Sequence, residues 1–128
     1  MSHFTTVTTQ IKDIAALRAA VQEMGLTLLE NAEARGYSTN TTKGDYVVRL
    51  KGPYDIAVNK QTDGTYGLTT DWWDGHVEKE VGAKFGKLLQ LYAVHKATME
   101  ARKKGHMVQR KPQKNGAIKL IIAGIGGV

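Results

Sequence analysis

An apolar stripe in the second half of the chain places the strongest limit on its fold. The stripe residues recur at intervals of four, four, three, four and seven positions, which is the spacing of one helix face. They are Val77, Val81, Phe85, Leu88, Tyr92 and Met99. Acidic residues near the start and basic residues in the last turn follow the order that the helix dipole favours. We therefore predict one long helix from Asp74, its N-cap, to Lys104, and we expect its last turns to project beyond a small sheet.

Before this helix, five segments have the composition of β-strands, and several of them alternate apolar and polar residues. They are residues 3–11, 26–29, 46–50, 54–58 and 66–72. Asp63-Gly64 predicts a tight hairpin turn, because a type I′ turn needs a positive φ at both central residues. Residues 30–35 continue the second strand as a polar stretch, and residues 36–44 have the composition of a loop.

A short helix and a terminal hairpin complete the pattern. Apolar residues at 3-4-3 spacing follow an N-cap candidate, Asp13, and precede a natural helix stop, Gly25. After the long helix, residues 106–111 and 117–122 flank Asn115-Gly116, which is a strong hairpin signal. The sequence therefore predicts a strand pair at the C-terminal end.

Together these elements predict an α+β fold. We expect an antiparallel sheet with two helices packed on one face, in the order β-α-β-β-β-β-α followed by a C-terminal β-hairpin. One domain over residues 1–128 accounts for the length, because a chain of this size buries a single core. The other face of the sheet is expected to be open. The tail, residues 123–128, is expected to be either flexible or bound by a partner.

Composition limits the possible chemistry. The chain has no cysteine, which excludes disulfides, thiol catalysis and thiolate metal sites. No apolar run approaches the roughly 20 residues that span a bilayer, so we expect no membrane association. The first residues lack the basic and apolar regions of a signal peptide. A cytoplasmic location is therefore the default expectation.

Positive charge is concentrated near the C-terminus. Residues 96–119 hold eight basic residues and one acid, Glu100, whereas residues 1–95 are close to neutral. A localised basic face favours an anionic partner, and RNA or DNA is one candidate. The candidate anion-binding residues are Arg102, Lys103, Lys104, Arg110, Lys111 and Lys114. The region has no aromatic residue on which bases could stack, so a solvated basic face is the simpler interpretation.

A run of Asp-Trp-Trp-Asp-Gly-His before the long helix is the densest polar-aromatic cluster. Asp71, Asp74 and His76 offer oxygen and nitrogen ligands for a metal ion. The simpler interpretation needs no metal: Asp74 caps the helix, Trp72 packs in the core and Trp73 faces outward. Because an exposed Trp is a frequent interface hot spot, Trp73 is a candidate partner-binding residue.

The rest of the chain shows no recognisable catalytic motif. The remaining histidines are scattered, and no Gly-x-Ser-x-Gly elbow occurs. Gly82 and Gly86 would form a notch on the predicted helix, open to the backbone of the protein's own sheet or of a second subunit. We therefore expect no catalytic residue, no cofactor and no bound metal.

Several segments resemble one uncharacterised family. They are residues 2–13 (Ser-His-Phe-Thr-Thr-Val-Thr-Thr-Gln-Ile-Lys-Asp), 54–58, 66–72 and 115–120. The family is that of hypothetical chloroplast reading frame thirty-five, with cyanobacterial and plastid members, and the resemblance spans nearly the whole chain. It implies a small protein of the cytoplasm or plastid stroma with no established catalytic residues. Its gene neighbours, an AAA-type ATPase and a ferredoxin-like protein, imply an accessory subunit.

From these observations we predict a non-catalytic binding or adaptor domain that acts within a protein complex. The candidate partner-binding residues are Trp73, Ile118, Leu120, Ile121 and Ile122. The strand 118–122 is included because an unguarded sheet edge invites strand addition. The partner would be a protein, with an ATPase-containing assembly as one form, or a second copy of the chain. Nucleic-acid binding through residues 96–119 is the alternative, and a metal-dependent enzyme using residues 71–76 is the third hypothesis.

Overall fold

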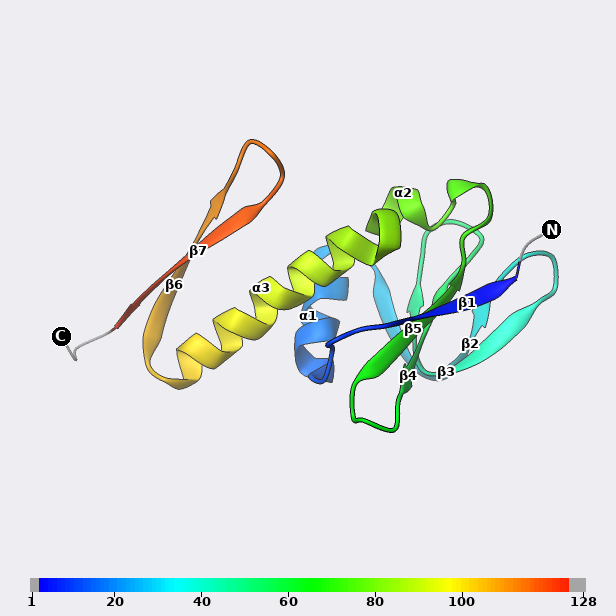
Figure 1. Cartoon of the computed structure of the whole chain (residues 1–128), viewed down its shortest axis with the longest axis horizontal. Helices are drawn as coiled ribbons and strands as arrows, with labels where there is room; N and C mark the ends of the chain where they lie inside the picture. The colour runs from blue at the N-terminus through cyan, green and yellow to red at the C-terminus, as the bar shows by residue number, and fades with distance from the viewer. Residues whose placement is uncertain (1–2, 125–128) are drawn as a thin grey trace.

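The computed structural model describes residues 3–124 and shows a sheet-and-helix body from which one long helix projects (Figure 1). A hairpin lies beside the projecting end of this helix. The strands and helices are β1 (Phe4–Thr8), α1 (Ile14–Glu23), β2 (Thr27–Arg35), β3 (Thr41–Arg49), β4 (Ile56–Lys60), β5 (Tyr66–Asp71), α2 (Glu78–Val81), α3 (Gly86–Lys103), β6 (His106–Pro112) and β7 (Ile118–Gly124). Two short 3₁₀ turns, η1 (Trp73–Gly75) and η2 (Ala83–Phe85), flank α2. The predicted α+β class and element order are confirmed.

The body is a five-stranded antiparallel sheet in the order β1-β5-β4-β3-β2, and the core lies between one of its faces and the helices α1 and α3. Leu17 from α1, Leu88 from α3 and Ile56 and Leu68 from the sheet are fully buried there. Asp13 caps α1 as predicted, because its carboxylate accepts a hydrogen bond from the Ala16 N–H at 3.2 Å. None of the described helices is long and apolar enough to cross a membrane.

The second face of the sheet is not open, contrary to the sequence-based expectation. Strands β2 and β3 extend well into the stretch that was expected to be a loop, so that the connection covers only residues 36–40. Ala34 of this extension packs on Val47 and Ala57 in a second, fully buried cluster. Small residues permit the close approach of β3 and β4 here, because a Cβ at Gly44 would lie only 3.2 Å from the Ala57 Cα. The hairpin of β2 and β3 therefore covers part of the face that we expected to find free.

A buried carboxylate fixes the end of this hairpin to the sheet. Asp55 is fully buried and lies 2.8 Å from the Arg35 guanidinium and 3.3 Å from Nε of Arg49. It also accepts hydrogen bonds from the backbone N–H groups of Arg35 and Leu50. Both arginine side chains are partly exposed, so one buried anion holds two cations that reach the surface.

The long helix is broken near its start, which corrects the prediction of one continuous helix. Asp74 does not cap it: this residue lies in η1 with a φ of 56°. Helix α2 ends at Val81 and is followed by Gly82, whose φ is 85°, and α3 begins only at Gly86. The break lets Val81 and Phe85 both be fully buried, with the Phe85 ring 4.6 Å from that of Trp72. The spacing of the apolar residues in the sequence is therefore compatible with two helices separated by a break as well as with one continuous helix.

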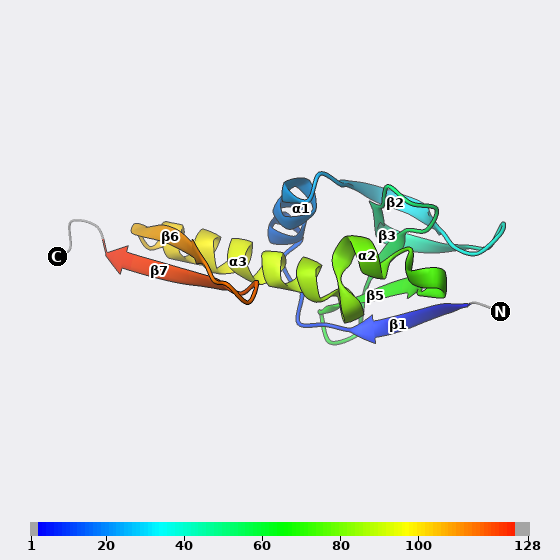
Figure 2. The same ribbon diagram turned by 90° about the horizontal axis from the view of Figure 1, so that it is seen from above.

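The predicted notch between Gly82 and Gly86 is accordingly wrong. Gly82 lies between the two helices and has a positive φ, which glycine adopts without steric cost. A Cβ at Gly82 would lie 2.9 Å from the Lys87 backbone nitrogen, so this position has no room for a side chain. Beyond this break, α3 runs past the sheet as expected, and the two-stranded sheet of β6 and β7 lies along its outer half (Figure 2).

We expect Asp55→Ala to lower the free energy of unfolding by about 3 kcal/mol, because it leaves two guanidinium groups and two backbone N–H groups without their acceptor. Urea unfolding followed by circular dichroism measures this loss. The control is Glu30→Ala, which removes an exposed ion pair with Arg18 and should cost less than about 1 kcal/mol. Equal losses in the two variants would contradict the role given to Asp55.

Candidate functional site

The C-terminal hairpin has two faces of different character. Val108, Ile118 and Leu120 lie on the same face, which is half-buried, and Ile118 packs against the core. Met107 and Ile121 lie on the opposite face, where Met107 is 64% exposed. The alternation of strand side chains therefore gives the hairpin one attached face and one free face. We call the second the outer face, made of Met107, Gln109, Lys111, Lys119, Ile121 and Ala123.

A second helical stripe supports the attached face. Leu91, Val94, Thr98 and Ala101 are buried at 3-4-3 spacing on α3. Val94 and Ala101 are buried without belonging to the core cluster of the body. The hairpin runs beside the C-terminal part of α3, the helix that carries this stripe (Figure 1). The stripe predicted from the sequence lies on a different side of the same helix and does not include these residues.

A three-residue ion cluster ties the hairpin to both helices. Arg110 of β6 makes two hydrogen bonds, at 2.9 and 3.0 Å, to the carboxylate of Glu23 at the end of α1. Nε2 of His95 on α3 lies 2.7 Å from the same carboxylate. Arg110 was predicted to bind an external anion, but its guanidinium is already paired with Glu23. We call this cluster of Glu23, His95 and Arg110 the latch.

The turn of the hairpin is held more loosely. Gln90 of α3 donates a hydrogen bond of 3.1 Å to the Gly116 carbonyl oxygen. Between the turn and the two helices lies an open cleft of about 480 Å³, whose walls include Met24, Leu91 and Ile118. The hairpin is therefore attached by the latch, by one turn contact and by part of one face.

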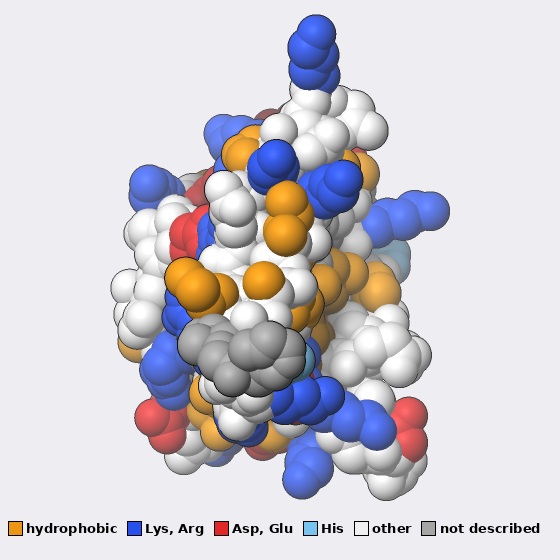
Figure 3. Space-filling view, turned by 90° about the vertical axis from the view of Figure 1, so that its left-hand side faces the viewer, with side chains coloured by type: hydrophobic (Ala, Val, Ile, Leu, Met, Phe, Trp, Pro, Cys, Tyr) orange, Lys and Arg blue, Asp and Glu red, His pale blue; other side chains and the backbone are white. Residues whose placement is uncertain are grey.

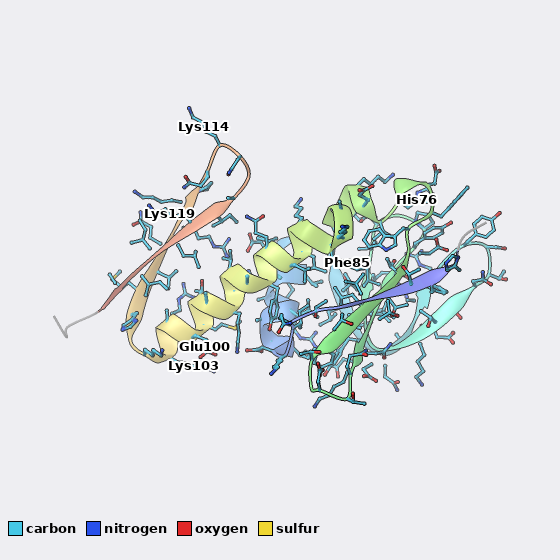
Figure 4. The ribbon with its side chains drawn as sticks, in the orientation of Figure 1. His76, Phe85, Glu100, Lys103, Lys114 and Lys119 are labelled. Carbon is cyan, nitrogen blue, oxygen red and sulfur yellow. The ribbon has the colours of Figure 1, made fainter. Side chains whose placement is uncertain are left out.

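The other predicted anion-binding residues are exposed at this end of the molecule. Arg102, Lys103 and Lys104 lie at the end of α3, and Lys111 and Lys114 lie on the hairpin (Figure 4). Lys103 comes within 3.8 Å of Glu100. From Ala101 to the end of the sequence there is no acidic residue. Figure 3 shows hydrophobic side chains lying among Lys and Arg on this end.

The outer face contains a shallow apolar hollow. Its volume is about 360 Å³, and Met107, Val108, Gln109, Ile121 and Ala123 line it. Ile121 and Ile122 of the predicted partner-binding set are exposed, whereas Ile118 and Leu120 are half-buried on the attached face. Met107 was not selected from the sequence, because an isolated Met in a basic strand gives no signal until its cross-strand neighbours are known.

Trp73 is exposed as predicted but lies at the other end of the molecule. It follows β5 in η1, far from the hairpin (Figure 1). Its ring meets that of Tyr37 at 6.3 Å and 76°, and the two side chains are 46% and 45% exposed. The structure therefore divides the predicted partner-binding residues between two separate surfaces. Tyr37 was missed because it is distant in sequence.

The residues of the metal hypothesis are not arranged around one point. The buried carboxylate of Asp71 accepts hydrogen bonds from the backbone N–H groups of Tyr37 and Trp73, at 3.2 and 3.0 Å. Asp74 lies 3.7 Å from His76, whose ring packs on Tyr54. Within residues 3–124, no three His, Asp or Glu side chains are grouped as metal ligands. The predicted tail is described only for residues 123 and 124, and residues 125–128 lie outside the described part.

A family model described as a protein of unknown function (DUF1257) matches residues 20–121, most of the chain. The chain belongs to the DUF1257 family. The match runs from α1 into β7, so the DUF1257 region includes the hairpin as well as the sheet.

The chain is also similar to an uncharacterised protein, ycf35, of Pyropia yezoensis. The two are 31% identical over 126 residues, which cover 95% of this chain and 96% of the relative. The predicted resemblance to the chloroplast reading frame family is thereby confirmed. No solved structure matches this DUF1257 protein significantly. Neither name describes an activity, so we infer a function from the surfaces described above.

The latch makes the attachment of the hairpin dependent on pH. The hydrogen bond from Arg110 is the main cause that holds the pKa of Glu23 below its usual range, against the opposing effect of burial. A lowered pKa in the folded state means that Glu23 stabilises the attachment above the ordinary glutamate pKa, about 4.3. This contribution is lost as the pH falls through the lower value of the folded protein.

We therefore expect NMR contacts between Ile118 and Leu91 to weaken in this acidic window in the wild type. In Glu23→Gln the attachment should be weaker at neutral pH and should not change further on acidification, because the amide does not titrate. If the wild type and Glu23→Gln lost these contacts at the same pH, the latch would not be the titrating group.

Proposed function

We propose that this protein is a non-catalytic binding domain that docks an acidic protein partner on its C-terminal hairpin. The observation that carries the proposal is the outer face of the hairpin, where exposed Met107 and Ile121 line a hollow edged by lysines. An apolar centre with a charged rim is the usual composition of a protein interface.

The hairpin is also an incomplete sheet. A two-stranded ribbon is marginally stable alone and normally needs further strands or a packed helix. Here α3 covers one face, while within residues 3–124 neither β6 nor β7 pairs with any other strand. An extended segment of a partner could add to this ribbon through backbone hydrogen bonds and place apolar side chains against the outer face. Strand addition is therefore the geometry that we propose for the complex.

The charge of this region favours an acidic partner over a second copy of the chain. Two hairpins placed edge to edge would bring Lys111, Lys114 and Lys119 of each copy close together, with no acid from residue 101 onward to offset them. An acidic segment of a partner is instead attracted electrostatically to the same lysines. Association with such a partner should be faster at low salt, because long-range attraction steers the encounter.

We place this binding in the cytoplasm or plastid stroma, as the resemblance to the chloroplast reading frame family implies. A subunit of an ATPase-containing assembly is one form that the acidic partner can take. The proposal assigns no chemistry to the domain and needs no cofactor. Its role would be to hold or recruit the partner.

Ile121→Asp should remove partner capture, because it places a carboxylate in the apolar hollow while leaving the attached face unchanged. The tagged protein would be purified from native lysate with and without nuclease, and the recovered proteins identified and quantified. We expect to recover a discrete acidic partner whose amount is unchanged by nuclease treatment. The amount recovered should be at least tenfold lower with Ile121→Asp than with the wild type. The matched control is Thr62→Asp, which places a carboxylate at an exposed position between β4 and β5, outside the hairpin.

Other results of the same experiment would overturn the proposal. Recovery that is equal for Ile121→Asp and wild type would exclude the hairpin as the docking surface. Broad recovery that disappears with nuclease would indicate nucleic acid instead. Recovery of differently tagged copies of the chain itself would indicate self-association.

Nucleic-acid binding is the second candidate, because Arg102, Lys103 and Lys104 are exposed together at the end of α3. It predicts affinity for RNA or single-stranded DNA that falls steeply with salt, since each phosphate contact releases a counterion. Changing these three residues to Glu should weaken binding and flatten the salt dependence. Fluorescence anisotropy with a labelled oligonucleotide measures both, and unchanged affinity in the variant would eliminate this candidate.

A further inference from the structure

The exposed rings of Tyr37 and Trp73 form a second surface, separate from the hairpin. They come from two different connections, one between β2 and β3 and one between β5 and α2. The rings meet edge to face, with centroids 6.3 Å apart and planes at 76°. Each side chain is nearly half exposed, so part of each ring is accessible to a ligand. Exposure of two large aromatic side chains side by side is unusual unless they contact something.

Buried groups hold both connections in place beneath these rings. One carboxylate, that of Asp71, is 1% exposed and accepts the backbone N–H groups of both Tyr37 and Trp73. The next residue toward β2, Gly36, lies against the Phe4 ring so closely that a side chain would overlap it. The core therefore fixes the backbone at both rings, which lowers the entropic cost of binding.

The backbone around the rings is strained as well as fixed. Ser38 and Asp74 have φ values of 58° and 56°, in the left-handed region that non-glycine residues rarely adopt. Each follows one of the aromatic residues directly. Such strain persists only where the surrounding structure imposes it, and it is concentrated at functional sites.

The two chain segments that carry the rings are together negatively charged. Residues 36–42 contain no charged side chain, and residues 71–78 contain three carboxylates and no Lys or Arg. Two of these carboxylates, Asp74 and Glu78, are exposed. This is the reverse of the hairpin end, so the two surfaces cannot prefer the same ligand.

We propose that Tyr37, Trp73 and Asp74 form a binding site for an arginine-containing segment of a partner protein. A guanidinium group is planar, stacks on aromatic faces and pairs with carboxylates. Trp and Tyr faces supply the stacking surface, and Asp74, whose side chain is 71% exposed, supplies the carboxylate. Arginine fits this combination better than lysine, whose ammonium group is strongly hydrated and does not stack.

The test uses the full chain and two capped peptides, Gly-Arg-Gly-Arg-Gly and the same sequence with citrulline at both arginine positions. Citrulline keeps the shape of arginine and removes its charge. Binding is followed by the NMR signals of the two indole N–H groups, those of Trp72 and Trp73. We expect a saturable shift of the Trp73 signal with the arginine peptide and roughly tenfold weaker binding of the citrulline peptide.

Three variants locate the site. Tyr37→Ala should abolish the Trp73 shift or weaken binding at least tenfold, whereas Tyr37→Phe, which keeps the ring, should bind normally. Trp73→Ala has no Trp73 signal, so its binding is measured by isothermal titration calorimetry and should be at least tenfold weaker. Glu30→Ala, which removes an exposed carboxylate outside both surfaces, is the control and should have no effect. Circular dichroism confirms that each variant is folded.

The following results would overturn the proposal. Equal binding of the two peptides would show that charge is not recognised, and an unmoved Trp73 signal would place the peptide elsewhere or show that it does not bind. A Trp73 shift that appears on concentrating the protein alone, and disappears when Arg102, Lys103 and Lys104 are changed to Gln, would make a second copy the occupant. None of these results depends on whether the hairpin binds an acidic partner.

Discussion

The structure depends on α3 packing against two different elements along its length. Its first half places Leu88 and Tyr92 in the core of the body, where the Tyr92 hydroxyl also accepts hydrogen bonds from the backbone N–H groups of Lys12 and Asp13. Its C-terminal part extends past the sheet and lies beside the hairpin, and α3 also carries a separate buried stripe that includes Val94 and Ala101. Because one rigid helix makes both contacts, the hairpin has a defined position although it shares no strand pairing with the body.

This arrangement places the two candidate surfaces at opposite ends of the molecule (Figure 1). The hairpin end combines exposed Met107 and Ile121 with lysines, whereas the Tyr37–Trp73 end combines aromatic rings with carboxylates. The two proposals therefore concern separate surfaces of opposite charge, and each can be tested without the other.

The sequence was sufficient where local signals determine local structure. Asp13 as a cap, Asp63-Gly64 and Asn115-Gly116 as turns, and the alternation of the sheet strands each act within a few residues, and the element order followed from them. The expected type I′ geometry is wrong, because only the glycine of each turn has a positive φ, at Gly64 and Gly116. The break at Gly82 could not be predicted in this way, because the apolar spacing from Val77 to Leu88 is the same with or without it.

Long-range contacts set the remaining features, and the sequence carried no signal for them. The packing of Ala34 over the second face depends on contacts across the sheet, and the pairing of Tyr37 with Trp73 depends on where two distant connections meet. The pairing of Arg110 with Glu23 likewise joins residues that are 87 positions apart. A count of charges along the sequence therefore treated Arg110 as free to bind an external anion, although its guanidinium is already paired with Glu23.

The separation of the hairpin from the body also bears on how this family can diverge. Substitutions on the outer face, at positions such as Gln109, Lys119 and Ile121, touch neither the core nor the sheet, and exposed substitutions of this kind usually change stability by only a few tenths of a kcal/mol. The chemical character of the outer face can therefore drift during evolution while selection continues to preserve the same folded body. Orthologues with nearly identical cores could in this way come to serve different complexes.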